Sequence, residues 1–108
     1  MRTANRLKAP LLILAALLCL PIVANAELQK SEISRGAMLS NTCAGCHGTD
    51  GKSPGAVPSI NGKPKEFLEM AIKKYRSGEW DSTVMRRHVR GYTDEEIRLI
   101  AEYFASKK

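Results

Sequence analysis

The sequence predicts one small all-α domain. Apolar residues recur at helical spacing in separate segments of the chain, and stretches rich in Gly and Pro divide these segments. No alternation of apolar and polar residues, which would indicate a half-buried strand, flanks the Cys-rich segment at residues 43–47. An apolar leader occupies the first 26 residues, so 82 of the 108 residues remain, which is the size of one small domain.

The first 26 residues have the pattern of a secretory signal peptide. A basic start, an apolar run and a small-x-small pattern follow one another: Arg2, Arg6 and Lys8, then residues 11–20, then Ala24, Asn25 and Ala26. The alternative is an uncleaved membrane anchor, for which residues 9–26 barely reach the usual length of about 20 apolar residues. Pro21 and the Ala-Asn-Ala ending favour cleavage after Ala26. We therefore expect a periplasmic domain of residues 27–108, without Cys19 and with membrane contact only through the leader.

The charge of the chain argues against a nucleic-acid partner. The formal net charge is +6, but three of the 17 basic residues and none of the 11 acidic residues lie in the leader, which leaves +3 for residues 27–108. A charge of this size, without interleaved aromatic and basic residues, does not indicate a nucleotide groove. A domain of 82 residues has a marginal core and often depends on a bound group.

The first helix of the domain is expected to begin at Ser31, as its N-cap, and to run into residues 43–47. Ile33 and Ala37 provide an apolar face for this helix. Gly36 lies inside it and costs about 1 kcal/mol relative to Ala. Such a glycine indicates that another helix packs closely there, and the last helix is the expected neighbour.

The rest of the domain divides into a loop and three helical segments. Residues 48–62 hold four glycines and two prolines and are expected to form the loop. A second helix is predicted from Pro64 to Ser77, with Gly78 as its stop, followed by one or two helical turns between Asp81 and Val89. The last helix begins with a capping box at Thr93 to Glu96, and its apolar face consists of Ile97, Ile100, Ala101 and Phe104.

Residues 43–47 read Cys-Ala-Gly-Cys-His, and this C-x-x-C-H pattern is typical of covalent haem attachment. On one helical turn, Cys43 and Cys46 can both reach the porphyrin while His47 points at its iron. A zinc site would need more ligands than Cys19 and His88 can add. A thioredoxin-like pair would need a βαβ pattern, which is missing, and a simple disulfide or a chance match is the remaining alternative.

A second axial ligand decides whether such an iron transfers electrons or stays open for chemistry. Met38 lies five residues before Cys43 on the same helix, so it is badly placed to reach the opposite haem face. Met70 lies within the second predicted helix, where a core role is expected. Met85 lies 38 residues after His47 in a short segment that can cover the opposite haem face. His88 is the competing ligand and would give a lower potential. We predict Met85, because its soft thioether favours the ferrous state.

Together these motifs resemble a class I c-type cytochrome, over residues 36–104. The resemblance implies a monohaem cytochrome c fold with three main helices and short turns around one covalent haem c. It implies a crossing of the first and last helices at Gly36 and at the Tyr103 and Phe104 pair. The residues that match the family's haem site are Cys43 and Cys46 for the thioether links, His47 and Met85 for the iron, Pro58 for the carbonyl that accepts from the proximal histidine, and Ile60 for the haem pocket.

Within that class, Ser82 to Met85 and Gly91 to Thr93 are most similar to the cytochrome subunit of flavocytochrome c sulfide dehydrogenase. In that family a flavoprotein takes two electrons from sulfide and passes them singly to the cytochrome. Many members carry two haem domains, whereas this sequence has one C-x-x-C-H pattern.

The resemblance implies a periplasmic electron-transfer subunit that is not catalytic alone and accepts electrons from a flavoprotein sulfide dehydrogenase subunit or another periplasmic redox protein. The alternatives are a freely diffusing carrier to a terminal oxidase or peroxidase, and a haem enzyme or sensor with an open sixth site. Four lysines could steer an acidic partner or form an ordinary solvated helix face: Lys63, Lys65, Lys73 and Lys74. The arginines at 86, 87 and 90 are expected to form a solvated face.

Overall fold

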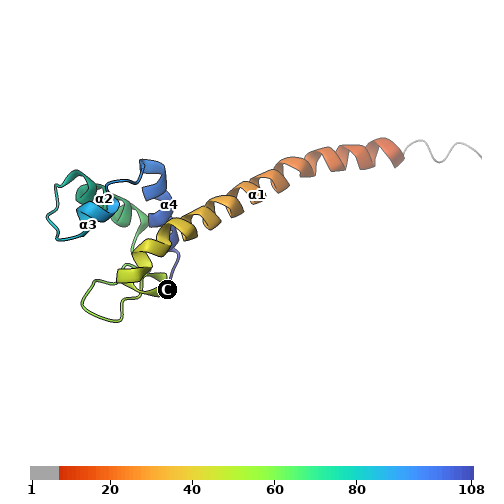
Figure 1. Ribbon diagram of the computed structural model, residues 1–108. Helices are drawn as coiled ribbons and strands as arrows, with labels where there is room; N and C mark the ends of the chain where they lie inside the picture. The colour runs from red at the N-terminus through yellow and green to blue at the C-terminus, as the bar shows by residue number, and fades with distance from the viewer. Residues whose placement is uncertain (1–7) are drawn as a thin grey trace, which may run out of the picture. The chain divides into compact units, whose positions relative to one another are not determined.

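The computed structural model describes the backbone of residues 8–108 and the side chains of residues 25–33 and 35–108. Within these residues it contains helices and no strands, so the predicted all-α class is confirmed (Figure 1). The elements are α1 (Lys8–His47), a short 3-10 turn (Thr49–Gly51), α2 (Lys65–Ser77), α3 (Met85–Val89) and α4 (Asp94–Ala105). The chain divides into two compact units, Met1–Ser31 and Glu32–Lys108.

The first unit contains the predicted leader. Arg2 and Arg6, which begin the signal-peptide pattern, lie outside the described residues. Among the residues that are described, no helix combines the length and the apolar character needed to cross a membrane. The prediction that a helix begins at Ser31 is wrong, because α1 runs without a break from Lys8 to His47. Residues 24–33 contain no Gly or Pro to interrupt it, so the helix passes through the serine.

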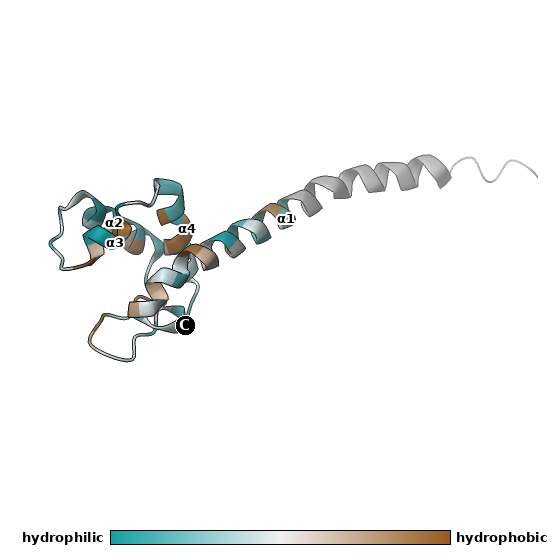
Figure 2. Ribbon diagram, viewed as in Figure 1, coloured by the Kyte–Doolittle hydropathy of each residue, from teal (hydrophilic) through white to brown (hydrophobic). Residues whose placement is uncertain are grey.

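The core of the second unit is built on α4, whose predicted apolar face is buried. Ile97, Ile100, Ala101 and Phe104 are all at most 2% exposed, and Leu68 of α2 packs against this face. Figure 2 shows hydrophobic stretches in brown where α2 and α4 meet. The helix starts with the predicted capping box, in which Thr93 Oγ1 accepts from the Glu96 amide and Glu96 accepts from the Thr93 amide.

Gly36 lies where α1 crosses α4, as its position inside a helix predicts. It is buried, and a Cβ atom added to it would lie 2.9 Å from the backbone oxygen of Leu99. Two ion pairs flank the crossing, Arg98 with Glu32 at 3.4 Å and Arg35 with Glu96 at 3.7 Å. This crossing therefore fixes the last turns of α1, which carry the C-x-x-C-H segment, relative to α4.

The loop of residues 48–62 returns to the carboxyl end of α4 (Figure 1). Ile60 donates its amide proton to the Gly51 carbonyl at 2.8 Å, and Gly62 donates to the Phe104 carbonyl at 2.9 Å. Gly51 has a φ of +79°, and the Phe104 ring occupies the space that a side chain would need there. These contacts hold both ends of the loop, so its middle part is carried in a fixed place.

The segment after α2 folds back so that α3 packs against α2. Gly78 ends α2 with a φ of +82°, as predicted, and α3 is shorter than the predicted segment because only Met85–Val89 is helical. Arg76 of α2 donates to the Tyr92 carbonyl at 2.9 Å and to Asp94 Oδ1 at 2.5 Å. These bonds hold the chain that follows α3 against α2.

Candidate functional site

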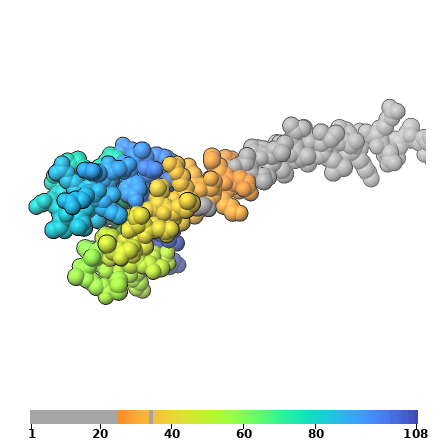
Figure 3. Space-filling view, viewed as in Figure 1, coloured from red at the N-terminus to blue at the C-terminus, as the bar shows by residue number. Residues whose placement is uncertain are grey.

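A cavity of about 720 Å³ lies in the second unit, within the size range of cofactor sites. Its lining comes from the last turn of α1, the 48–62 loop, α2, the α3 segment and α4, and is mainly apolar. In the space-filling view the lime-coloured loop and the cyan region of α2 and α3 form two lobes that part toward one side (Figure 3). Leu68, Ile100 and Phe104 form its floor, because they belong both to the lining and to the core.

His47 is the last residue of α1 and lines this cavity. Its Nδ1 lies 2.6 Å from the carbonyl oxygen of Pro58. A carbonyl can only accept, so Nδ1 is the donor of this bond, which leaves Nε2 as the ring nitrogen available to bind a metal. The bond that the sequence predicts between His47 and the loop is present.

Cys43 and Cys46 line the same cavity one helical turn apart, and both are free thiols. Cys43 is half-buried and Cys46 is exposed; desolvation by burial raises the pKa of the Cys43 thiol. No disulfide joins these two cysteines in the structure. No group of three or more His, Cys, Asp or Glu side chains gathers into a metal site in the part of the chain that the structure describes.

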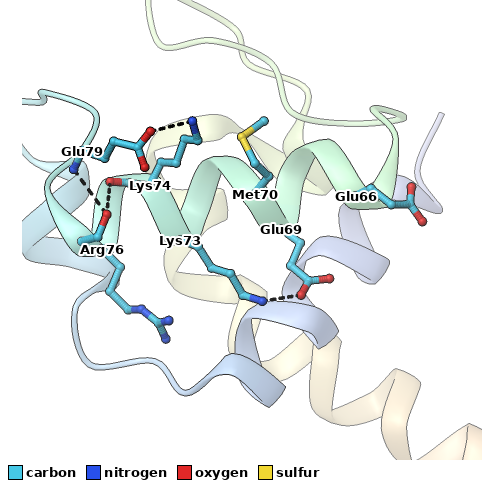
Figure 4. Close-up of a pocket in the computed structure, with 8 residues that line it drawn as sticks. Glu66, Glu69, Met70, Lys73, Lys74, Arg76 and Glu79 are labelled. Carbon is cyan, nitrogen blue, oxygen red and sulfur yellow. Dashed lines mark hydrogen bonds and ion pairs between the residues drawn. The ribbon is translucent and has the colours of Figure 1, made fainter.

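Of the possible second ligands, Met85 and His88 line the cavity and the other two methionines do not. Met85 opens α3 and is half-buried, whereas His88 is exposed. Met38 is 72% exposed, and Met70 lies in a shallow pocket along α2 among charged side chains (Figure 4). The geometry thus leaves Met85 and His88 as the two candidates and favours the more buried thioether.

Further lining residues complete the site. Ile60, which the resemblance assigns to the haem pocket, lines the cavity and packs on the core. Sequence reasoning missed four aromatic residues of the lining, Phe67, Tyr75, Trp80 and Tyr92. Tyr75 and Trp80 meet edge to face with ring centroids 5.4 Å apart, and the Tyr92 hydroxyl bonds to Thr42 Oγ1 at 2.9 Å. The sequence offered one signal for the last three, because each lies within ten positions of Met85, the predicted second iron ligand.

A small all-α domain with a C-x-x-C-H segment at a helix end, beside an apolar cavity, has the construction of a haem protein. The chain belongs to the cytochrome c family, whose family model matches residues 33–108. It therefore carries covalently bound haem c and transfers electrons.

The chain is similar to several bacterial cytochromes. It is 58% identical over 73 residues to the cytochrome subunit of sulfide dehydrogenase of Chlorobaculum tepidum, which covers 68% of this chain and 66% of that protein. It is 37% identical to cytochrome c-554(548) of Halomonas halodenitrificans, over 62% of this chain and 86% of that protein. It is 33% identical to the thiosulfate dehydrogenase electron acceptor of Stutzerimonas stutzeri, over 67% of this chain and 36% of that protein.

The residues of the cavity fit this prosthetic group. Two free thiols lie one turn apart, beside an imidazole whose Nδ1 is already held, and a thioether stands in the same lining. The remaining lining is apolar enough to enclose a flat macrocycle and to exclude water from it.

Proposed function

We propose that Cys43 and Cys46 form the two thioether links and that His47 Nε2 and Met85 Sδ bind the iron. The observation that carries this assignment is the 2.6 Å bond from His47 to the Pro58 carbonyl, on the cavity that both thiols and Met85 also line. Pro58 and Ile60 belong to the pocket in this proposal. We further propose that the leader is removed after Ala26 and that residues 27–108 work in the periplasm.

The haem supplies a one-electron couple between ferric and ferrous iron. The Pro58 carbonyl orients the His47 ring and raises its basicity. The Met85 thioether favours the ferrous state and so raises the potential. The apolar lining formed by residues such as Leu68 and Ile100 excludes water and disfavours the more highly charged ferric state. In this scheme no proton moves and no substrate bond is made or broken.

The partner that we propose is a flavoprotein dehydrogenase subunit that oxidises sulfide. The name of one relative, the cytochrome subunit of sulfide dehydrogenase, supports sulfide as the substrate of this partner. The name of a second, the thiosulfate dehydrogenase electron acceptor, supports a dehydrogenase partner in general. A flavin that has taken two electrons would pass them on in two single transfers, because one haem accepts one electron at a time.

A freely diffusing carrier is the second candidate. The similarity to cytochrome c-554(548), of which the match covers 86%, is the observation behind it, because that relative's name describes a cytochrome by itself. Sedimentation of the native protein separates the two functions, since a permanent subunit sediments with its flavoprotein and a carrier sediments alone. A flavoprotein that co-purifies and reduces the haem when sulfide is added would support the first candidate; failure to bind or reduce it would contradict that candidate.

The ligand assignment is tested with Met85→Ala and, as its matched control, His88→Ala. The wild-type ferric protein should show the weak red band of thioether-bound iron, and its ferrous form should resist carbon monoxide. Met85→Ala should lose the band and bind carbon monoxide rapidly, while His88→Ala should behave as wild type. If His88 were the ligand, the wild type would lack the red band, and His88→Ala rather than Met85→Ala would bind carbon monoxide rapidly. Rapid binding by the wild type would indicate an open-site enzyme or sensor. A pyridine adduct spectrum of Cys43→Ser and Cys46→Ser checks each thioether link.

A further inference from the structure

The lysines of α2 are poor candidates for steering a partner, because carboxylates of the same chain already pair with them. A cation that has a carboxylate at ion-pair distance contributes little to the long-range field. Figure 4 shows two of these pairs, Lys73 with Glu69 and Lys74 with Glu79, at different places along α2. The pairs are Lys65 with Glu102 at 3.2 Å, Lys73 with Glu69 at 2.7 Å and Lys74 with Glu79 at 2.7 Å.

The arginines of the α3 segment are different. Arg86, Arg87 and Arg90 are all exposed, and none of them forms an ion pair with a carboxylate in the part of the second unit that is described. Residues 82–93 contain no Asp or Glu at all. Three uncompensated positive charges are therefore concentrated on one short segment.

This segment adjoins the mouth of the haem cavity. Three large hydrophobic side chains line the cavity and are nevertheless exposed: Val57 at 39%, Phe67 at 43% and Val84 at 62%. Val84 immediately precedes α3, so the cationic segment and the apolar mouth are continuous. An apolar centre with charges at its rim is the usual anatomy of a protein interface, and rim charges act mainly on the rate of encounter.

We propose that Val84, Arg86, Arg87 and Arg90 form the docking surface of this cytochrome, which we call the α3 surface, and that its occupant is an acidic face of the redox partner. This inference rests on the proposed function, because it assumes that electrons enter through this cavity. Charge complementarity selects the occupant: an acidic surface gains attraction from three unpaired guanidinium groups, which bind carboxylates with two parallel hydrogen bonds. An approaching acidic protein feels these charges within about 10 Å at 0.1 M salt.

The test measures how fast the ferric holoprotein is reduced by two probes in stopped flow. One probe is reduced flavodoxin, an acidic flavoprotein, and the other is reduced lumiflavin, a small uncharged flavin. The charge-removal variant is Arg86→Gln/Arg87→Gln/Arg90→Gln, and the matched control removes three charges from α2 as Lys65→Gln/Lys73→Gln/Lys74→Gln. Rates are compared from about 10 mM to about 200 mM ionic strength, which shortens the range of these charges from about 30 Å to below 10 Å.

With flavodoxin, the arginine variant should react about tenfold more slowly than wild type at low ionic strength and should lose most of the salt dependence. The lysine control should stay within about twofold of wild type. Arg86→Lys/Arg87→Lys/Arg90→Lys should keep most of the salt dependence, and Val84→Glu should slow the reaction without removing an arginine. Val84→Glu also guards against a folding defect, because this side chain is 62% exposed.

Three outcomes would overturn the inference. Equal slowing by the arginine and lysine variants would mean that only net charge matters. An unchanged flavodoxin rate in the arginine variant would place docking elsewhere. A shifted reduction potential with unchanged salt dependence would mean that the arginines pair with the haem's own carboxylates. Lumiflavin separates these results from the proposed function: failure to reduce the wild-type haem with lumiflavin would contradict electron transfer itself, whatever the docking surface.

Discussion

The crossing of α1 and α4 predicts opposite effects for the same substitution at two glycines of one helix. Gly36 and Gly45 both lie in α1 and both have ordinary helical backbone conformations. Replacing a helical Gly with Ala stabilises a helix by about 1 kcal/mol when nothing else changes. At Gly45, nothing lies within 4 Å of an added Cβ, and the residue is outside the cavity lining. Gly45→Ala should therefore keep most of this gain.

At Gly36 the added methyl group meets the Leu99 backbone oxygen at 2.9 Å and the Leu99 Cβ at 3.7 Å. A backbone oxygen in the middle of α4 cannot rotate away, so one helix must move. Overpacking of this kind costs about 1–3 kcal/mol. After the gain in helix propensity is subtracted, Gly36→Ala should destabilise the domain by up to about 2 kcal/mol, so the two variants should differ by about 1–3 kcal/mol.

The assay is denaturant unfolding of the two holoproteins and the wild type, followed by far-UV circular dichroism. For a domain of this size the difference corresponds to about 4 °C or more in Tm. If Gly36→Ala were as stabilising as Gly45→Ala, the helices could separate freely at the crossing, and the argument that this contact fixes the haem-bearing end of α1 would be wrong.

Three other predictions concern the cap, the ion pair and the cofactor. Thr93→Ala removes the N-cap of α4 and should cost about 1 kcal/mol in denaturant unfolding. The hydrogen bond and charge of the Arg76 guanidinium lower the pKa of Asp94 in the folded protein. The stability that this pair contributes is therefore fully present above the ordinary pKa of an Asp carboxyl, and it is lost as the pH falls through the lower pKa of folded Asp94. Arg76→Gln should therefore move the acid-unfolding midpoint to higher pH, and should not do so when Asp94 is already Asn. Cys43→Ser/Cys46→Ser should leave the chain without covalent haem and with weak near-UV dichroism, because the cavity then stays unfilled; a native-like spectrum would contradict this.

The helices were predictable where local chemistry alone decides them. The capping box at Thr93 and the stop at Gly78 depend on hydrogen bonds and backbone angles within a few residues, and both are present. The start of the first helix was not predictable from Ser31. A serine caps a helix only where the residues before it are not helical, and residues 24–33 contain no Gly or Pro that would end the helix there.

The site was predictable where a spacing encodes it. The C-x-x-C-H pattern already contains both thiols and the imidazole, and a Gly and Pro loop of the right length supplies the carbonyl that holds His47. Tyr75, Trp80 and Tyr92 were missed because their place in the lining depends on how α2 and the α3 segment fold together. A spacing along the chain does not report such packing.

The sequence also did not reveal which basic side chains have a carboxylate partner. The sequence contains the α2 lysines and the α3 arginines as equal positive charges, and only the structure separates those that face a carboxylate from those that do not. The difference arises because α2 and its neighbours place a Glu within reach of each lysine tested above, whereas residues 82–93 offer no acid. A partner encounters the uncompensated charges, so the proposed docking surface follows from the pairing pattern and not from the formal net charge of the chain.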